Sequence, residues 1–418
     1  MTKRSILILV ASVFAALPAY AQVVEPVQGV PGNYPLPEGG AKALVQQRCI
    51  GCHDLRRVVN SNYSPQEWQN VVNMMMAAGA PINQNEANQI RDYLNASFPG
   101  KPRPKPVVID GPAKVEFLAW DTPTPGSRPH DPLAMPDGSI WWSGQFANKL
   151  GRLDPQSGEL REYPLPNPAG PHGLINDKDG NIWYAGNFGG HIGKLDPRTG
   201  EVKVYKLPDP KARDPHTPLF DKNGILWFSV QNGGFMGRLD PKTGDIKLVT
   251  PTGGPGQQPY ALRFLSDGVT PWFSYFGSNK LAKVDPVTME VKEYVLPDSR
   301  TRARRMGVTS DDMIWFGDWS NGRLNRFDPR TGEVKSWPGP GGQASQPYGF
   351  TVINDVIWYV ESNLRPNTLV RFDPKTEQFQ TWLIPSGGGI VRHMMPTRDG
   401  DIAMAMSGLS KVGVAVVK

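Results

Sequence analysis

About three quarters of the chain repeat with a period of 42 to 45 residues. An Asp-Pro pair recurs six times, beginning at Asp154, Asp196, Asp240, Asp285, Asp328 and Asp373. A tryptophan precedes each pair by 13 to 15 residues, and Thr-Gly or a relic of it follows most of them. A repeat of this length, made of short alternating segments, is typical of propeller blades with four antiparallel strands each.

The second unit shows the internal plan of a blade. We predict strands at Asn181–Gly186, His191–Asp196 and Glu201–Leu207. The last two are joined by Asp-Pro-x-Thr-Gly, a turn in which proline sets φ and glycine takes the left-handed position. The six turns therefore mark six complete blades.

A seventh blade needs a strand from elsewhere in the chain. The segment 391–418 lacks an outer strand, and residues 114–120 resemble the outer strands of the other units. Pairing these two segments would close the ring and remove its exposed sheet edges. We predict an all-β seven-bladed propeller over residues 113–418.

The repeat resembles the virginiamycin B lyase family, also called streptogramin lyases, across about 300 residues. The shared pattern is P-H-G-x, then D-G-x-I-W-F, then I-G-R-L-D-P-x-T-G, then a strand ending in L-P; Pro171 through Pro208 is the clearest copy. The resemblance implies this fold and an elimination reaction that opens an ester-linked ring. It also implies a histidine base in a late blade and Mg²⁺ held with a glutamate.

The match to that activity is incomplete. Glu361 falls on the acidic position, but the base position falls on Tyr348, and Arg305 or Met306 stands where a histidine would help. An unperturbed tyrosine, with a pKa near 10, is a poor base at neutral pH. These departures argue against antibiotic lyase activity.

One residue at the start of each innermost strand should face the central channel. The candidates for ligand binding are His130, His172, His216, Tyr260, the Arg304–Met306 stretch with Arg305, Tyr348, and Arg392 or His393. A second ring contributes Asp318 and Glu361, with Gln145 and Asn187 nearby. Convergent polar groups are typical of binding sites, and we take Tyr348, Glu361, Asp318 and His393 as candidate catalytic residues. The alternative is that these residues only hydrate a water-filled channel and that duplication copied the histidines.

The N-terminal part contains Cys49-Ile50-Gly51-Cys52-His53, the C-x-x-C-H pattern of covalent c-type haem attachment. Cys49 and Cys52 are the only cysteines of the chain. A thioredoxin-like redox pair would need a βαβ context, and a zinc site would need a second Cys/His pair nearby. We therefore expect Cys49 and Cys52 to hold one haem c, with His53 as the proximal iron ligand.

Residues 38–98 resemble small class I cytochrome c domains over about 60 residues. The motif is followed by Glu67-Trp68, Val72, Met75, Gly79-Ala80 and Tyr93-Leu94. We expect an all-α domain with helices at 41–48, 65–76 and 85–98, and Ser64 with Glu67 forms a capping box. The resemblance points to Met75 as the distal iron ligand, while Met74 and Met76 stay open. Methionine ligation raises the haem potential, which suits electron transfer.

Two further segments complete the expected organisation. Residues 1–21 form a signal peptide, with Lys3 and Arg4, an apolar core and an Ala-Tyr-Ala cleavage site, followed by an extension over 22–37. Residues 99–112 are a proline-rich linker. In a Gram-negative source the mature protein would be periplasmic, without a transmembrane segment. Its net charge of +6, or +4 once Lys3 and Arg4 are removed, does not predict nucleic-acid binding.

The sequence thus predicts a multidomain protein, an all-α cytochrome c domain followed by an all-β propeller. The main hypothesis is a periplasmic c-type cytochrome with electron transfer activity, coupled to a propeller that binds a ligand or substrate. The alternatives are a Mg²⁺-dependent carbon–oxygen lyase or an oxidoreductase that passes electrons from a small organic substrate to the haem. The expected partners are a periplasmic redox protein or a small anionic substrate, since Arg304, Arg305 and Arg392 would suit an anion.

Overall fold

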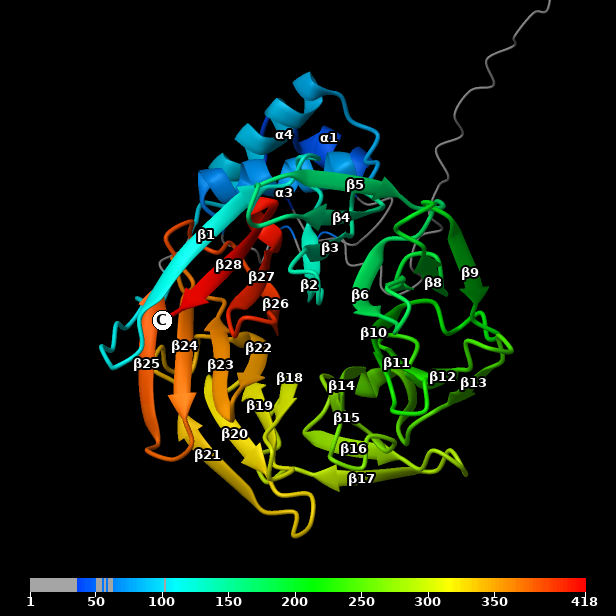
Figure 1. Ribbon diagram of the computed structural model, residues 1–418. Helices are drawn as coiled ribbons and strands as arrows, with labels where there is room; N and C mark the ends of the chain where they lie inside the picture. Colours follow the sequence, from blue (N-terminus) through cyan, green and yellow to red (C-terminus); the bar gives the residue numbers. More distant parts are fainter. Residues whose placement is uncertain (1–35, 50–54, 56–57, 59–62, 101–102) are drawn as a thin grey trace, which may run out of the picture.

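The structure, a computed structural model, describes residues 36–49, 55, 58, 63–100 and 103–418. The predicted signal peptide, most of the predicted N-terminal extension, Cys52 and His53 lie outside these residues. Within them, seven four-stranded antiparallel sheets surround a central axis (Figure 1). The seven-bladed all-β propeller expected from the repeat is confirmed.

Each of the first six blades uses four consecutive strands, from the innermost to the outermost. Blades 1 to 3 contain β2 (Pro129–Ala134), β3 (Ile140–Gly144), β4 (Lys149–Leu153) and β5 (Leu160–Pro164); β6 (Pro171–Asn176), β7 (Ile182–Gly186), β8 (His191–Leu195) and β9 (Val202–Lys206); and β10 (Pro215–Phe220), β11 (Leu226–Val230), β12 (Phe235–Leu239) and β13 (Ile246–Val249). Blades 4 to 6 contain β14 (Pro259–Phe264), β15 (Pro271–Tyr275), β16 (Lys280–Val284) and β17 (Val291–Val295); β18 (Ala303–Val308), β19 (Ile314–Asp318), β20 (Arg323–Phe327) and β21 (Val334–Pro338); and β22 (Pro347–Ile353), β23 (Val356–Glu361), β24 (Thr368–Asp373) and β25 (Gln378–Leu383). A short 3₁₀ helix, η1 (Gly254–Gln257), precedes blade 4.

The seventh blade closes the ring with the two ends of the propeller sequence. It consists of β26 (Val391–Pro396), β27 (Ile402–Met406), β28 (Lys411–Val417) and, as its outer strand, β1 (Val115–Asp121), with η2 (Ser407–Leu409) between β27 and β28. β1 runs antiparallel to β28, from the pair Val115–Val417 to the pair Asp121–Lys411. The predicted closure is therefore confirmed.

The repeated tryptophans form the contacts between and within blades. Trp183 is almost fully buried, stacks on Tyr205 of the outer strand at 5.4 Å and donates a hydrogen bond from Nε1 to Asp177 at 2.9 Å. Trp227 makes the same bond to Asp221. The tryptophan of the repeat thus fastens the turn before its own strand, which explains why both recur together. The Asp-Pro turn recurs because its aspartate accepts backbone N–H groups and its glycine has a positive φ, 78° at Gly200.

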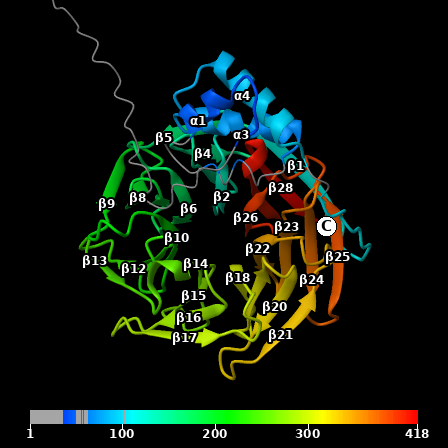
Figure 2. The same cartoon turned by 180° about the vertical axis from the view of Figure 1, so that it is seen from behind.

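Three helices precede the propeller among the described residues: α1 (Lys42–Cys49), α3 (Pro65–Ala77) and α4 (Gln84–Ser97). The capping box of Ser64 and Glu67 is present, and Asn83 with Glu86 forms a second one. The helices pack around their own apolar core, which includes Val45, Trp68 and Leu94. We call residues 36–98 the helical segment. In Figures 1 and 2 it lies at the rim of the propeller near β1, β5 and β28.

The connection to the propeller is extended and hydrogen-bonded. Residues 103–112 contain no helix or strand. Val107 and Ile109 bond to Thr381 of β25, through its hydroxyl and its backbone N–H. The connection therefore follows the outer edge of blade 6. It does not act as a spacer between the helical segment and the propeller. None of the helices that the structure describes has the length and apolar character to cross a membrane.

Candidate functional site

The second residue of every innermost strand lies in one ring around the channel. The strand begins with proline in five of the seven blades, and the register shifts just after it in every blade. Such a bulge redirects side chains toward a site. The ring, which we call the channel ring, consists of His130, His172, His216, Tyr260, Arg304, Tyr348 and Arg392.

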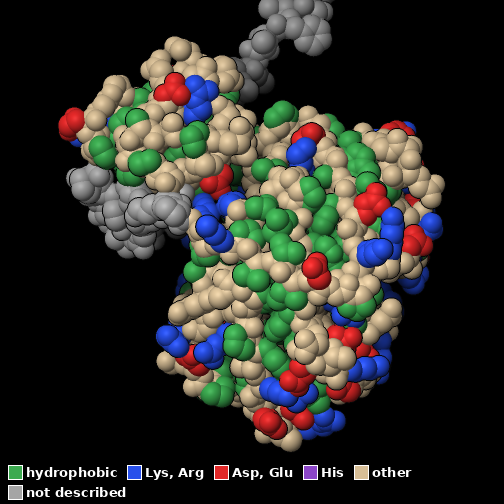
Figure 3. Space-filling view, turned by 90° about the vertical axis from the view of Figure 1, so that its left-hand side faces the viewer, with side chains coloured by type: hydrophobic (Ala, Val, Ile, Leu, Met, Phe, Trp, Pro, Cys, Tyr) green, Lys and Arg blue, Asp and Glu red, His purple; other side chains and the backbone are tan. Residues whose placement is uncertain are grey.

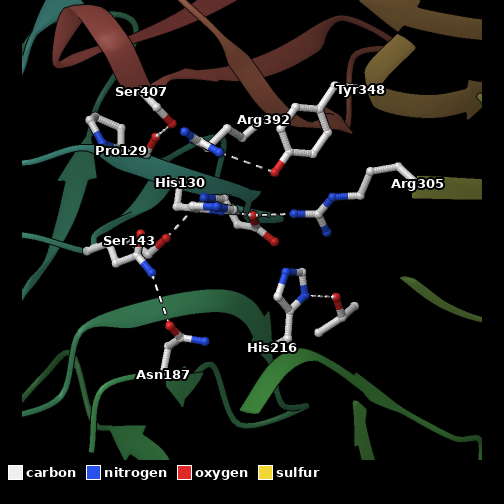
Figure 4. Close-up of polar contacts among 12 residues, drawn as sticks. Pro129, His130, Ser143, Asn187, His216, Arg305, Tyr348, Arg392 and Ser407 are labelled. Atoms are coloured by element: carbon white, nitrogen blue, oxygen red, sulfur yellow. Dashed lines mark hydrogen bonds and ion pairs between the residues drawn. The ribbon is translucent and has the colours of Figure 1, made fainter. Parts of the chain in front are cut away.

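The sequence predicted this ring nearly in full. Within the Arg304–Met306 stretch, Arg304 takes the ring position and Arg305 lies one residue further along β18. Arg392, not His393, takes the position in blade 7, and His393 lies near Arg305 and His216. Figure 4 shows His130, His216, Arg305, Tyr348 and Arg392 reaching toward a common space from different strands.

The histidine side of the ring is a stack of buried, neutral rings. The ring centroids of His130 and His172 are 3.5 Å apart, and those of His172 and His216 are 3.8 Å apart. His216 continues the stack to Tyr260 at 4.1 Å. Burial, followed by the neighbouring cations and histidines, lowers the pKa of all three imidazoles well below its ordinary value. The stack carries no charge at neutral pH.

The opposite side of the ring is cationic. The guanidinium of Arg304 lies 3.6 Å from the ring centroid of Tyr348, and Nη1 of Arg392 donates to the Tyr348 hydroxyl at 3.4 Å. Arg305 is buried, with only 1% of its surface exposed. Burial raises the pKa of Tyr348, but Arg304, Arg392 and Arg305 outweigh that effect and lower it to about 7. Tyr348 can therefore form a phenolate at neutral pH.

A hydrogen bond joins two tyrosines of the ring. The hydroxyl oxygens of Tyr260 and Tyr348 are 2.8 Å apart, and both side chains are buried. Burial and the neighbouring Tyr348 raise the pKa of Tyr260 to about 12. Tyr260 therefore keeps its proton and donates a hydrogen bond to the Tyr348 phenolate, which stabilises the charged form of Tyr348.

An ion pair spans the channel beneath the ring. Nη2 of Arg305 lies 2.7 Å from Oδ1 of Asp131, which also contacts Nδ1 of His130 at 2.8 Å. Both Asp131 and Arg305 are the third residues of their innermost strands. Sequence reasoning missed Asp131, although an alignment of the seven units would have shown a charged residue there where other blades have Gly173, Thr217 or Ala261.

Several buried donors around the channel lack a partner among the described residues. They are Nε and Nη1 of Arg305, Nε of Arg392, and Nδ1 of His172 and His393. A buried group without a hydrogen bond costs about 1–3 kcal/mol. Asp131 is the carboxylate that faces the guanidinium groups of Arg263, Arg305 and Arg392. The channel therefore has unmatched donors and excess positive charge, which suits an anion.

The carboxyl groups of Asp318 and Glu361 are both bonded to the surrounding protein. Both oxygens of Asp318 accept hydrogen bonds, from the Thr301 hydroxyl, Asn321 and the backbone N–H of Arg302. Glu361 is fully buried, accepts from the backbone N–H of Gly341, and has one unpartnered oxygen. Burial raises its pKa to about 7, so it readily keeps a proton. One such carboxyl does not fit Mg²⁺, which prefers ionised oxygen ligands.

A second possible cation site lies in the channel itself. Ligand atoms of His130, Asp131 and His172 lie within 4.8 Å of one another. The ion pair between Asp131 and Arg305 occupies the one carboxylate of this cluster. Nearby guanidinium groups would repel a cation, so the charge of the channel favours an anion here as well.

The remaining predicted residues of the second ring have structural partners. Gln145 donates from Nε2 to the side-chain oxygen of Asn187 at 3.3 Å, and Asn187 donates to the carbonyl of Pro215. Asp318 and Glu361 end the second strands of neighbouring blades and bind adjacent loops. The structure therefore brings the residues of the channel ring, including Tyr348, together. Asp318 and Glu361 instead form hydrogen bonds with the loops next to their strands.

Two of the residues predicted to hold a haem can be placed. Cys49 is half-buried at the end of α1 and packs against the apolar core of the helical segment, as does Met76. Met75 is also half-buried, and Met74 faces the propeller. The choice of Met75 as ligand stays a prediction.

The propeller is similar in sequence and in fold to known proteins. Residues 113–255 match the virginiamycin B lyase family. The solved virginiamycin B lyase from Staphylococcus aureus is similar at 21% identity with a TM-score of 0.66, covering 72% of this chain and 99% of its own. A streptogramin B lyase structure is 25% identical with a TM-score of 0.66, covering 73% of this chain and 98% of its own.

A third similar structure has a ligand. It is a catalytically inactive S. aureus virginiamycin B lyase with a histidine-to-alanine substitution, in complex with quinupristin. It is 20% identical with a TM-score of 0.65, and the match covers 72% of this chain and 99% of its own. No curated protein sequence matches the chain. The propeller is thus virginiamycin B lyase-like in fold.

Proposed function

We propose that the propeller binds an anionic substrate in its channel and removes a proton from it with Tyr348, in a carbon–oxygen elimination. The observation that carries this proposal is the cluster of Arg304, Arg305 and Arg392 around Tyr348. A general base works best when its pKa lies near the operating pH, and Tyr348 meets that condition. The likeness to virginiamycin B lyases supports elimination as the reaction class.

The proposed step balances without a further reactant. The Tyr348 phenolate takes the proton from the carbon next to a substrate carbonyl. The C–H electron pair forms the new C=C bond as the C–O bond beyond it breaks. An alkoxide leaving group takes up the proton that Tyr348 now holds and becomes a hydroxyl, whereas a carboxylate leaving group departs as the anion. Arg304 and Arg392 stabilise the negative charge that develops on the carbonyl oxygen, as donors in a water-poor site do.

In this proposal, Tyr348 takes the role that the resemblance assigns to a histidine of the virginiamycin B lyases. The guanidinium groups that surround the Tyr348 phenolate can also stabilise the negative charge of the enolate that forms when the base removes the proton. A neutral imidazole without such neighbours would need a metal or another donor for that purpose. The proposed substrate is therefore a carboxylate-bearing ester or ether rather than a neutral antibiotic.

The test is turnover of carboxylate-bearing β-acyloxy and β-alkoxy carbonyl compounds, with quinupristin, which lacks a carboxylate, as the comparison. The formation of a conjugated double bond is followed by ultraviolet absorbance and the products by mass spectrometry. We expect unsaturated products from anionic compounds in the wild type and none from Tyr348→Phe. Hydrolysis without unsaturation, or full activity in Tyr348→Phe, would contradict the proposal.

A second candidate function is electron transfer by a haem c held in the helical segment. It is favoured by the C-x-x-C-H motif and by the shared packing of Cys49 and Met76. Cys49, Cys52, His53 and Met75 or a neighbouring methionine would hold the group. When bound, a c-type haem supplies a one-electron redox centre. A protein of this kind would be exported to the periplasm and would exchange electrons with a partner protein or with an oxidised substrate.

The two candidates are separable on the full chain, expressed with a periplasmic haem-attachment system. Haem that stays bound in a denaturing gel, and is lost in Cys49→Ser, supports the second candidate; its absence in the wild type overturns it. Reduction of the haem during turnover of an anionic substrate would show that the substrate is oxidised, and would contradict elimination. Turnover with no change in the haem spectrum supports elimination.

A further inference from the structure

A large cavity lies between the helical segment and the mouth of the channel. Its volume is about 640 Å³, within the range of about 300–1,000 Å³ common for small-molecule sites. From α3, Glu67, Val71 and Met74 line it. From the propeller, Ile390, Arg392 and Leu409 do so. The cavity therefore exists only because both units are present.

The roof of this cavity is held in place by close packing. Glu67 accepts from Nε of Arg365 at 2.8 Å and from Arg103 at 3.3 Å. Figure 3 shows acidic and basic side chains together where the helical segment meets the propeller. At Gly126, φ is 73° and a Cβ atom would lie only 2.4 Å from the carbonyl oxygen of Asn73 on α3. The helix thus touches the backbone of the propeller directly.

Arg392 joins the cavity to the channel. It lines the cavity, and its Nη1 donates to the hydroxyl of Tyr348 at 3.4 Å. Ser407 also lines the cavity and donates to the carbonyl of Pro129, at the start of an innermost strand (Figure 4). A ligand whose anionic group binds Arg392 at the channel thus has the cavity beside it.

We propose that the substrate has an apolar arm next to its anionic group, and that the cavity beneath α3 binds this arm. The inference rests on the proposed function and adds a substrate class, an amphiphilic carboxylate. Val71, Met74, Ile390 and Leu409 supply apolar contacts along the cavity, while Arg392 fixes the charged end. Under this proposal the helical segment is part of the substrate site, whatever group it carries.

The test uses unbranched alkanoates, from acetate to octanoate, as probes of the full chain by isothermal titration. Each methylene placed in an apolar site strengthens binding by about fourfold, from about 0.8 kcal/mol. We expect the affinity to rise along the series, with octanoate binding at least about 100-fold more tightly than acetate. The small probe, acetate, measures the anion site alone.

Two substitutions on opposite walls test the location. Leu409→Asn and Val71→Asn should each flatten the dependence on chain length and leave acetate binding unchanged. Leu118→Asn, at a position 39% exposed on β1, is the matched control and should behave as the wild type. Thermal unfolding and acetate affinity confirm that each variant is folded.

The outcomes separate this inference from the function on which it rests. If acetate does not bind at all, the anion site and the proposed function fail. If acetate binds but octanoate binds no better, the apolar arm is wrong, and the cavity holds another occupant, such as the haem group, another segment of this chain or a second copy. If the wild type shows the gain and both cavity variants keep it, the arm binds elsewhere and the inference also fails.

Discussion

Tyr260 and Tyr348 occupy the same position in two blades of one ring and have opposite acid–base properties. Both are the second residue of an innermost strand, both are buried, and their hydroxyl oxygens are 2.8 Å apart. Tyr260 adjoins the neutral histidine stack, and its pKa is raised to about 12. Tyr348 lies among three guanidinium groups, and its pKa is lowered to about 7.

The difference shows that the fold sets the position of a side chain, whereas its neighbours set its chemistry. A propeller repeats a backbone position seven times, and substitution at the positions around it makes each copy different. The histidine side of the channel ring is neutral, whereas the arginine side is charged. A base and an electrophile can thus arise on one side of a channel without any change of backbone.

The largest expected effect comes from removing the two hydroxyl groups separately. Tyr348→Phe should lower turnover of an anionic substrate by about 100- to 10,000-fold, the usual contribution of a positioned base. Tyr260→Phe removes one hydrogen bond to the phenolate and should cost about tenfold at neutral pH. Steady-state kinetics measure both; equal losses in the two variants would remove the distinction between the tyrosines.

The ion pair that connects the two sides should matter for folding. Arg305→Met leaves Asp131 buried without its partner and should lower the free energy of unfolding by about 3–5 kcal/mol. Arg300→Met breaks an exposed pair with Asp298, where the arginine side chain is 64% exposed, and should leave the free energy of unfolding nearly unchanged. Urea unfolding compares the two, and similar costs would show that the channel pair is not desolvated.

The charge of the arginine side should set the pH dependence. Because the phenolate is the active form, the rate should rise with pH through about 7. Arg304→Met removes a neighbouring cation, so the pKa of Tyr348 should rise by about 1–3 units and the rate profile should move to higher pH by the same amount. Arg302→Met, two residues earlier, is the control, and its profile should match that of the wild type. An unmoved profile in Arg304→Met would mean that other groups control the pH dependence.

The smallest effect is expected on the neutral side. His172→Phe keeps an aromatic ring in the stack and removes no charge, because burial already holds the imidazole neutral. We expect acetate affinity and the pH profile to change by less than about threefold and about 0.5 units, since loss of one weak donor costs about 1 kcal/mol or less. Loss of most of the acetate affinity would show that the histidine side, too, binds the anion.

The sequence was sufficient to predict the propeller, because the repeat fixed the blade period and the missing outer strand of 391–418 required a partner. The channel ring was also predictable, since six of its members lie 10 to 12 residues before the tryptophan of their own unit and Arg392 lies at the start of the last unit. The properties of the site were not. The pKa of Tyr348 depends on Arg304 and Arg392, which are 44 residues away on either side and meet it only when neighbouring blades pack together. The catalytic interpretation of Asp318 was reasonable from spacing, but its oxygens bond to Thr301 and Asn321.

The proposed elimination depends most directly on the phenolate of Tyr348, and a tyrosinate titration tests for this phenolate without a known substrate. The near-ultraviolet difference absorbance of the folded protein is recorded against pH in the wild type, Tyr348→Phe and Tyr260→Phe. We predict one tyrosinate that forms near pH 7 in the wild type and is absent in Tyr348→Phe. If every tyrosine of the wild type titrates at about 10 or above, the ordinary range, Tyr348 is not the base and the proposed elimination fails.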